Sequence, residues 1–437
     1  SSFDAKTQYG QSWTYNYSRK TLAGIALESQ LTDVFKLRTG FRYGDMWREY
    51  QYVSVMLDDS LENYTETAIG SPRQHEITRS GNALVDAAFD TFGLGHTVTF
   101  GVTGTNFTYT RGDDVKSVLG TSTIADPVDY DDPALALGGT NVWYEQEYLN
   151  WVLGDRIQFD DQWSVLIGFN RASLSLDRWG SGSALSNSNY KQDHLTPTYA
   201  LMYKPIDNMT TYLSYMEGLA TGGTAPTTYN GETVVNGGDM LSPSVSKQYE
   251  IGSKATFGQV DLTAALFYID KINEYTDPDD LVYKQDGRQV HKGVEFTLTG
   301  KITPNLSMVG GFTWLDAEIE RSNDASLEGK TPVNVPEKQA RIYLDYILPF
   351  APQYTVSAGA FYNGKRPVNA NNTAYLDESL TFDTGLRYLT TVDGHDVSVN
   401  LNVINVFDTA YWAYYRSGDG LFLGEPRTVA LNVKISL

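Results

Sequence analysis

The chain ends on a strict alternation of apolar and polar residues, in the segment PRTVALNVKISL. Successive side chains of an extended strand point to opposite faces, so this alternation has the period of a β-strand. One face of the segment is aliphatic and the other is polar. Such a strand is typical of a barrel wall between lipid and a wet interior. The apolar face holds Val429, Leu431, Val433, Ile435 and Leu437, and the polar face holds Thr428, Asn432, Lys434 and Ser436.

The same period recurs along the chain. A charged residue such as Glu295, inside one of these segments, would be costly in a dry core but costs little on a face that meets water. We find neither a convincing amphipathic helix nor a repeat of propeller-blade length. We therefore expect an all-β fold, an antiparallel up-and-down transmembrane barrel. The clearest alternating segments are 98–102, 163–169, 294–298, 306–314 and 397–403.

Connections between these segments are of two kinds, tight turns and long polar stretches. A meander with short periplasmic turns at one end and long extracellular loops at the other is the pattern of outer-membrane barrels, whereas a β-sandwich would have short loops at both ends. The predicted turns are 160–162, 205–208, 257–259, 303–305, 349–352 and 392–395. The predicted long connections are 112–145, 178–192, 219–245, 271–288, 317–335 and 366–377.

Counting back from the C-terminus gives about 17 candidate strands. The first of them lie near 21–31 and 34–57, and residues 1–18 have the composition of a loop. A single-chain bacterial barrel normally has an even number of strands, because both edges must close. The odd count predicts that strands are missing, so we expect the C-terminal portion of a larger barrel.

Composition excludes several classes of function. The formal net charge is -20, which argues against nucleic acid as a partner because phosphate binding needs clustered Lys and Arg. The chain has no Cys, which excludes a disulfide framework, a thiolate zinc site and cysteine catalysis. No run of about 18 apolar residues is present to span a bilayer as a helix. The 30 Tyr and 8 Trp suit a membrane interface, although all-β proteins in general also favour aromatic residues.

Six short motifs resemble one family in the same order along residues 89–437. The closing segment, Asn405-Val406-Phe407-Asp408 followed by Pro426-Arg427-Thr428, is similar to the C-terminal signature of TonB-dependent outer-membrane receptors, ferric-siderophore branch. The chain departs from that family at Leu437, where Phe or Trp is usual. The other five motifs are Phe89 with His96 and Gly101, Leu195-Thr196-Pro197, Leu241-Ser242-Pro243 before Tyr249-Glu250-Ile251-Gly252, Gly293-Val294-Glu295, and Val335-Pro336.

The resemblance implies one β-barrel domain over residues 1–437, part of a 22-stranded barrel whose plug and first strands are missing from this sequence. It implies a receptor in the outer membrane of a Gram-negative bacterium that binds a ferric siderophore at extracellular loops and takes it into the periplasm. The implied energy source is the TonB–ExbB–ExbD complex, acting through the missing plug region. Iron would stay coordinated by the siderophore, with no cofactor bound by the protein. Outer-membrane lipid and lipopolysaccharide are the other implied partners, and we expect a monomer.

Three alternatives stay open at this point. Haem, cobalamin and oligosaccharides also travel through related barrels, and the loop sequences do not choose among these ligands. A passive porin-like channel would conduct ions without a partner, although the motifs argue against it. A soluble, secreted β-protein that binds glycans through its aromatic residues would have to pack its aliphatic faces on each other.

Aromatic residues of the predicted loops are the candidate ligand-binding residues. Ferric siderophores are bulky chelates with much apolar and aromatic surface, which rigid aromatic walls bind at low entropy cost. The alternative for each residue is the aromatic girdle that anchors a barrel among lipid headgroups, or plain loop packing. Trp179 and Tyr415 lie furthest into predicted loops. The candidates are Trp143, Tyr144, Trp179, Tyr414 and Tyr415.

Acidic residues give no catalytic or metal site. The loop 126–132 could offer carboxylates to Ca²⁺, but its spacing is not that of an EF-hand and a solvated loop is the simpler interpretation. No G-x-S-x-G or H-E-x-x-H motif occurs, and the paired acids lie in predicted turns, so we predict neither catalytic residues nor enzyme activity. Five charged residues fall on inward faces, where they would meet a plug or pair with each other: Glu250, Lys254, Glu295, Asp383 and Arg387.

Overall fold

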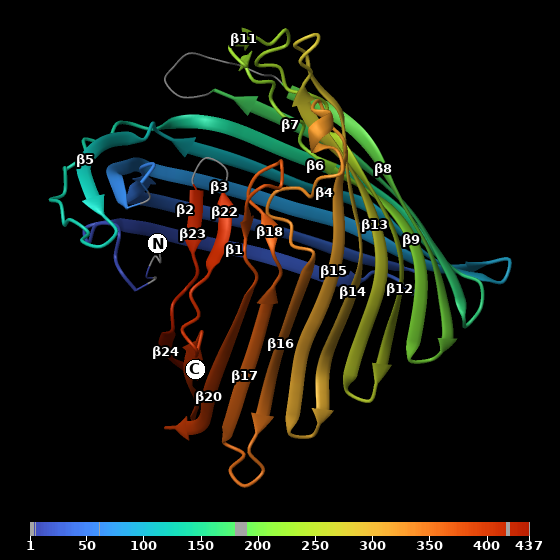
Figure 1. Cartoon of the computed structure of the whole chain (residues 1–437). Coiled ribbons are helices and arrows are strands. Elements are labelled where there is room, and N and C mark those ends of the chain that lie inside the picture. Colours follow the sequence, from blue (N-terminus) through green and yellow to red (C-terminus); the bar gives the residue numbers. More distant parts are fainter. Residues whose placement is uncertain (1–3, 5, 61, 180–189, 417–419, 437) are drawn as a thin grey trace. The chain divides into compact units, whose positions relative to one another are not determined.

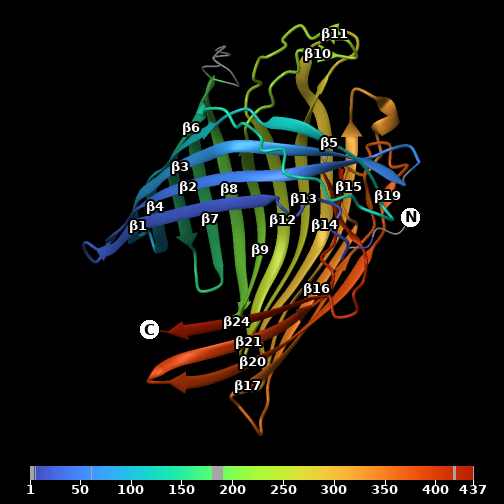
Figure 2. The same cartoon turned by 90° about the vertical axis from the view of Figure 1, so that its left-hand side faces the viewer.

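The computed structural model describes every residue except 1–3, 5, 61, 180–189, 417–419 and 437, and it is almost entirely β-structure (Figures 1 and 2). The chain divides into two compact units, which we describe separately. Unit 1 comprises residues 1–159 and 166–198, and unit 2 comprises residues 160–165 and 199–437. The described helical structure is one 3₁₀ turn, η1 (Ala325–Leu327). Within the described residues, no helix has the length and apolar character needed to cross a membrane.

Unit 1 is built on an antiparallel ladder in which consecutive long strands pair. β1 pairs with β2, β2 with β3, β3 with β4, and β4 with β6, while β5 pairs with the part of β3 that extends past the end of β4. Strands β7 (Trp163–Arg178) and β8 (Tyr190–Ile206) carry the chain between the units. The ladder strands are β1 (Tyr15–Gln30), β2 (Phe35–Leu57), β3 (Asn63–Thr91), β4 (Leu94–Arg111), β5 (Val115–Thr123) and β6 (Asn141–Gln158).

Unit 2 is a second antiparallel meander, in which nine pairings join successive long strands from β9 to β24. Its tight turns lie at the lower ends of the strands in Figure 1, and the long connection that carries β11 lies at the upper end. The long strands are β9 (Met209–Ala220), β12 (Ser244–Phe257), β13 (Val260–Thr276), β14 (Tyr283–Thr303), β15 (Leu306–Arg321), β16 (Lys338–Ile347), β17 (Tyr354–Asn363), β20 (Ser379–Val392), β21 (His395–Ile404) and β24 (Thr428–Ser436). The long connections hold the short strands β10 (Thr228–Tyr229), β11 (Glu232–Thr233), β18 (Arg366–Pro367), β19 (Tyr375–Leu376), β22 (Trp412–Arg416) and β23 (Gly420–Leu423).

Two-residue turns hold the register of these ladders. Asp393 and Gly394, between β20 and β21, have φ of 50° and 82°, and Phe92 and Gly93, between β3 and β4, have φ of 52° and 79°. Two consecutive positive φ values are the conformation of the turn whose twist matches a right-handed β-hairpin. Register matters here because a slip of one residue would exchange the two faces of a strand.

Each unit has an apolar face on which aliphatic and aromatic side chains line up across neighbouring strands and are exposed or half-buried. In unit 1, Phe100 is 52% exposed, and in unit 2, Leu431 is 67% exposed. Within each unit, the described residues place no second sheet or helical layer over these rows. The opposite side of each ladder is called the polar face below. The aligned rows are Leu37, Val85, Phe100 and Leu153 in unit 1, and Val356, Leu386, Leu401 and Leu431 in unit 2.

The predicted turns are confirmed, but several of the predicted long connections run into strands, and two of them do so by many residues. The stretch 112–145 contains β5 and the beginning of β6, and the stretch 271–288 is reduced to residues 277–282 because β13 and β14 extend into it. In these extensions the backbones still pair, as Tyr275 with Lys284, while the side chains lose the apolar alternation that marks a strand in sequence. Much of the connection 178–192 lies outside the described residues.

The strand count agrees with the sequence interpretation, with one difference at the beginning. The described residues form 18 strands of nine or more residues, or 17 when the short loop strand β5 is left aside. β1 begins at Tyr15, so the prediction that residues 1–18 are all loop was wrong by four residues. The total of 22 strands implied by the resemblance stays an expectation.

The apolar face can be tested by placing a charge on it. We expect Leu401→Arg to destabilise the folded barrel by about 2–4 kcal/mol, because a cation among acyl chains near the middle of a membrane costs about that much. The matched control is Asn402→Arg, the next residue of the same strand, whose side chain lies on the polar face. Heat-modifiable mobility in SDS gels of the full-length protein measures the folded fraction. Equal losses for the two variants would contradict the assignment of faces.

Candidate functional site

An aromatic cluster lies on the polar face of unit 1, at the loop end of β4 and β6. Phe107, Tyr109, Trp143 and Tyr144 form it, with ring centroids 6.2 Å apart for Tyr109 and Trp143 and 5.4 Å apart for Tyr109 and Tyr144. The guanidinium carbon of Arg111 lies 4.0 Å from the centroid of the Trp143 ring. The rings thus form a continuous apolar surface, and the Arg111 guanidinium packs against it.

A β-bulge explains how two consecutive residues of β6 both join the cluster. Tyr109 pairs with Tyr144 and Thr110 pairs with Val142, so Trp143 is an extra residue without a partner across the ladder. In a regular strand Trp143 and Tyr144 would point to opposite faces. A bulge re-aims one side chain, and here it lets both rings contact Tyr109.

The face of the cluster follows from strand alternation. Phe107 and Tyr109 have the parity of Thr103, which lies opposite Asn150 on the polar face. Phe100 and Trp151 have the other parity, and their rings stack on each other with centroids 6.2 Å apart on the apolar face. Tyr144 and Trp143 are therefore placed away from the surface where an aromatic girdle would lie. Whether they contact a ligand stays a prediction.

Trp179 joins this part of unit 1 through its backbone. It follows directly after the last residue of β7, and its N–H donates to the carbonyl of Trp143 at 2.9 Å. The structure therefore brings three of the five predicted site residues together, namely Trp143, Tyr144 and Trp179.

The other two predicted site residues lie in unit 2, on the β22–β23 hairpin. They were expected in an irregular loop, but Tyr414 and Tyr415 are both strand residues of β22, paired with Phe422 and Leu421. The Tyr414 ring stacks on Phe422 with centroids 4.4 Å apart and is 46% exposed. Regular pairing satisfies backbone groups that a loop would leave to water, which favours the hairpin.

Two side chains from other connections hold this hairpin. The Arg366 guanidinium, on β18, donates to the carbonyls of Trp412, at 3.2 Å, and Ala413. Asn334 donates to the Tyr415 carbonyl and accepts from the Tyr415 N–H at 3.3 Å. Arg366 is only 8% exposed, and burial lowers its pKa. The carbonyls of the hairpin therefore take the place of the water molecules that the guanidinium loses on burial.

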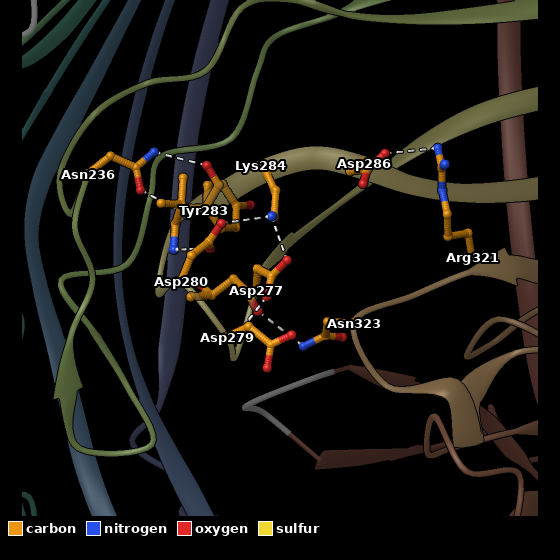
Figure 3. A network of polar contacts seen from close by, with 11 residues as sticks. Asn236, Asp277, Asp279, Asp280, Tyr283, Lys284, Asp286, Arg321 and Asn323 are labelled. Atoms are coloured by element: carbon orange, nitrogen blue, oxygen red, sulfur yellow. Dashed lines mark hydrogen bonds and ion pairs between the residues drawn. The ribbon is translucent and has the colours of Figure 1, made fainter.

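Polar contacts also join three long connections of unit 2 to one another (Figure 3). The Lys284 ammonium lies 2.5 Å from the Asp277 carboxylate and 3.1 Å from the Asp280 carboxylate. These two ion pairs close the β13–β14 connection. Asn236, from the β9–β12 connection, accepts from the Tyr283 N–H at 2.8 Å. Asn323, from the β15–β16 connection, donates to the carbonyl of Thr276 at 3.2 Å.

Glu274 is the acceptor at the centre of these connections. Its carboxylate accepts from the Gly223 N–H at 2.9 Å, from the Tyr283 hydroxyl at 3.1 Å and from the Gln285 amide at 2.8 Å. A Cβ on Gly223 would lie 2.1 Å from a Glu274 carboxylate oxygen, so any larger residue would force the Glu274 side chain to move. The three acceptor contacts tie the beginning of the β9–β12 connection to β13 and β14.

The pKa values of this region keep its charges fixed at neutral pH. The hydrogen bond from Lys284 lowers the pKa of Asp277, and the same contact raises the pKa of Lys284. Burial, followed by the neighbouring Glu274 charge, raises the pKa of Tyr283 to about 12. A lowered carboxyl pKa stabilises the folded loop at higher pH, and that contribution is lost as the pH falls through the folded pKa of Asp277.

Four of the five inward charges predicted from sequence have identified partners: Glu250, Lys254, Asp383 and Arg387. Lys254 lies 5.5 Å from the centroid of the Tyr212 ring, whose hydroxyl donates to Glu250. The Arg387 guanidinium lies 3.5 Å from Asp345. Its expected neighbour Asp383 instead accepts from the Asn405 N–H at 2.9 Å. The sequence did not predict Asp345 as a partner of Arg387, because strand pairing decides which side chains become neighbours on the polar face.

The acidic loop 126–132 is tied to the N-terminal segment and to β3. Gln11 donates to the carbonyl of Val128 at 2.9 Å and to the fully buried carboxylate of Glu66 at 2.6 Å. Trp13 donates to the carbonyl of Tyr130 at 2.9 Å. Within the described part of the chain, no group of three or more His, Cys, Asp or Glu side chains could hold a metal ion.

Sequence reasoning missed Phe107, Tyr109, Arg111 and Arg366. A signal for the first three was present, because the apolar residues of β4 change parity between Val102 and Phe107, which moves the aromatic side chains to the polar face. No local pattern marks Arg366, whose partners lie 46 and 47 residues further along the chain.

The role of Arg366 as an anchor of the β22–β23 hairpin can be measured. We expect Arg366→Gln to speed hydrogen exchange of the β22 amides by about tenfold to a hundredfold, because hydrogen bonds from charged groups contribute about 1.5–3 kcal/mol. Lys365→Gln is the control, since the Lys365 ammonium lies over the Tyr375 ring and, among the described residues, forms no hydrogen bond or ion pair with the hairpin. Hydrogen-exchange mass spectrometry of the full-length protein gives both rates. Unchanged β22 exchange in Arg366→Gln would exclude the anchor.

Comparison with known proteins gives one family. Residues 1–406 match the family described as TonB dependent receptor-like, beta-barrel. The ferrichrome receptor FcuA of Yersinia enterocolitica is 26% identical over 433 residues, which is 98% of this chain and 57% of that protein. The catecholate siderophore receptor Fiu of Escherichia coli (strain UTI89 / UPEC) is 31% identical over 203 residues, which is 45% of this chain and 26% of that protein.

Solved structures agree with this result. The crystal structure of BauA, the ferric preacinetobactin receptor from Acinetobacter baumannii, matches with a TM-score of 0.85 and 25% identity, covering 99% of this chain and 65% of that one. The siderophore receptor PiuA from the same species shares the fold, with a TM-score of 0.79 and 21% identity over 97% of this chain and 65% of that one. The chain thus spans less than two thirds of FcuA and BauA. The match over residues 1–406 shows that the chain belongs to the TonB-dependent receptor β-barrel family.

Proposed function

We propose that this chain is the barrel portion of an outer-membrane receptor that binds a ferric siderophore and takes it into the periplasm. The observation that carries the proposal is the aromatic cluster with Arg111 on the polar face, at the loop end of β4 and β6. The names of FcuA, Fiu and BauA support the ligand class, since each is described as a receptor for ferrichrome, a catecholate siderophore or ferric preacinetobactin.

The chemistry of the cluster suits an iron chelate. Aromatic rings offer large, rigid contact area at a low cost in side-chain entropy. The Arg111 guanidinium is held by Asp114 at 2.9 Å and lies against Trp143, so it can face an anionic or carbonyl-rich chelate without a new side-chain ordering cost. The protein groups orient the chelate, and iron stays bound to the siderophore.

Transport against a gradient requires an energy source outside the barrel. We propose that a plug region, not included in this chain, couples the barrel to the TonB–ExbB–ExbD complex. FcuA and BauA are both considerably longer than this chain, which leaves room for such a region. The apolar faces of both units support insertion into the outer membrane of a Gram-negative bacterium, and we propose that the receptor acts as a monomer. The proposal assigns the protein no catalytic step.

The cluster gives a test of ligand class. We expect Trp143→Ala to weaken binding of the cognate ferric siderophore by about tenfold, because buried aromatic contacts are the usual affinity hot spots. Trp151→Ala is the matched control, because Trp151 lies on the same strand but on the apolar face, where it is 49% exposed. Quenching of intrinsic fluorescence in the full-length receptor, titrated with a panel of iron chelates, haem and cobalamin, measures both affinities.

The panel also separates the alternatives. Saturable binding of haem or cobalamin, in place of an iron chelate, would assign another substrate class to the same barrel, and adding an oligosaccharide to the panel tests the remaining class. Absence of binding by every ligand, together with ion conductance in planar bilayers, would favour the porin-like channel. Equal weakening of siderophore binding by Trp143→Ala and Trp151→Ala would show that the cluster is not part of the binding site.

A further inference from the structure

Two charged residues of opposite sign lie on opposite sides of the aromatic cluster, and Glu76 on β3 is the negative one. Glu76 pairs directly with Tyr109, and Tyr109 pairs directly with Tyr144, so the three side chains form one row across β3, β4 and β6. Side chains that lie directly opposite each other on neighbouring strands share a face of the sheet. Glu76 therefore lies on the polar face, and its carboxylate borders the rings.

Arg178, the last residue of β7, lies on the other side of the cluster. Its position has the parity of Asn170, whose amide donates to Asn150 on the polar face at 3.4 Å. The hydrogen bond of 2.9 Å from the Trp179 N–H to the Trp143 carbonyl places the end of β7 beside the cluster. A guanidinium therefore borders the rings on this side.

Within the described part of the chain, neither of these two charges is neutralised. The Glu76 carboxylate and the Arg178 guanidinium form no hydrogen bond or ion pair there, and both residues are half-buried. Arg111, the cation that packs on Trp143, is already paired with Asp114 at 2.9 Å. Three interstrand spacings, roughly 14 Å, separate Glu76 from Arg178. The cluster thus has a negative side and a positive side, and the charges of these four residues balance.

The next cation of the polar face acts only weakly on the cluster. Arg48, on β2, is exposed, and it donates to Asn16 at 3.2 Å and lies 4.7 Å from the centroid of the Tyr50 ring. Water screens the charge of an exposed side chain strongly. Arg48 therefore leaves Glu76 as the unpaired charge on its side of the rings.

The charge of a ferric chelate depends on its chemical class. Three hydroxamate groups carry one negative charge each and neutralise iron(III), whereas three catecholate groups carry two each and leave the complex a trianion. A half-buried, unpaired carboxylate repels an anionic ligand and favours N–H or ammonium groups, while an unpaired guanidinium favours carbonyl oxygens. A site with both charges suits a ligand that is polar but carries no net charge.

We infer that the cluster selects a ferric chelate without net charge, and that Glu76 is the specificity-determining residue that disfavours a trianionic tris-catecholate complex. The relatives do not decide this point, because FcuA is described as a ferrichrome receptor and Fiu as a catecholate siderophore receptor. The inference rests on the proposed function, and it narrows the ligand from ferric siderophores in general to the uncharged class.

The ratio of two affinities in the full-length receptor tests this inference. The probes are an uncharged ferric trihydroxamate and a trianionic ferric tris-catecholate, each titrated by quenching of intrinsic fluorescence. We expect the wild type to bind the trihydroxamate at least about tenfold more tightly, and Glu76→Gln to reduce this preference by about tenfold, because like charges brought together in an interface are costly. Arg178→Gln should increase the preference, because it removes attraction for the trianion.

Glu147→Gln is the matched control. Glu147 pairs with Asn106 on the face opposite the cluster, so its removal changes the net charge of the chain equally and should leave the preference unchanged. Raising the salt concentration should bring Glu76→Gln and the wild type closer together, because ions screen the carboxylate. Unaltered heat-modifiable mobility in SDS gels shows that each variant folds.

The remaining outcomes separate this inference from the proposed function. Tighter binding of the tris-catecholate by the wild type, or an equal preference in Glu76→Gln and the wild type, would overturn the charge selection and leave a siderophore receptor. Equal changes in Glu76→Gln and Glu147→Gln would show that the net charge of the chain acts, and not Glu76. Binding of neither chelate by the wild type would count against the proposed function itself.

Discussion

The whole structure depends on backbone pairing between antiparallel neighbours. Because each strand's N–H and C=O groups bond to the adjacent strand, the backbone is satisfied without helices or buried loops, and side chains are left to divide between two faces. That division lets one surface be aliphatic and exposed while the other carries Glu250, Arg387 and the aromatic cluster. The two-residue turns at Phe92-Gly93 and Asp393-Gly394 preserve it by holding the register.

Functional features arise where the regular ladder is interrupted or extended. The bulge at Trp143 puts two neighbouring rings on one face, and the extension of β13 and β14 past the apolar band gives Glu274 and Lys284 their partners. The β22–β23 hairpin is held by Arg366 and Asn334, which belong to other connections. Long loops in unit 2 are therefore joined to one another by hydrogen bonds between loops.

The aromatic cluster at the loop end of unit 1 combines Arg111 with four rings on the polar face. Guanidinium and amphipathic aromatic groups together can bind anions beside apolar surface. Strand parity and the bulge at Trp143 place all these side chains on the same face of the ladder.

The sequence by itself determined the strands, the apolar and polar faces, the tight turns and the family, because a period of two and a few turn residues are local properties. It placed Trp143 and Tyr144 among the site candidates but gave no reason to join them to Tyr109 and Arg111. Tertiary structure decided the bulge, the extensions of β13 and β14, the β22–β23 hairpin and the partners of Arg366 and Arg387. Each of these depends on which distant strands and loops adjoin, and pairing between residues dozens of positions apart leaves no periodic signal in the chain.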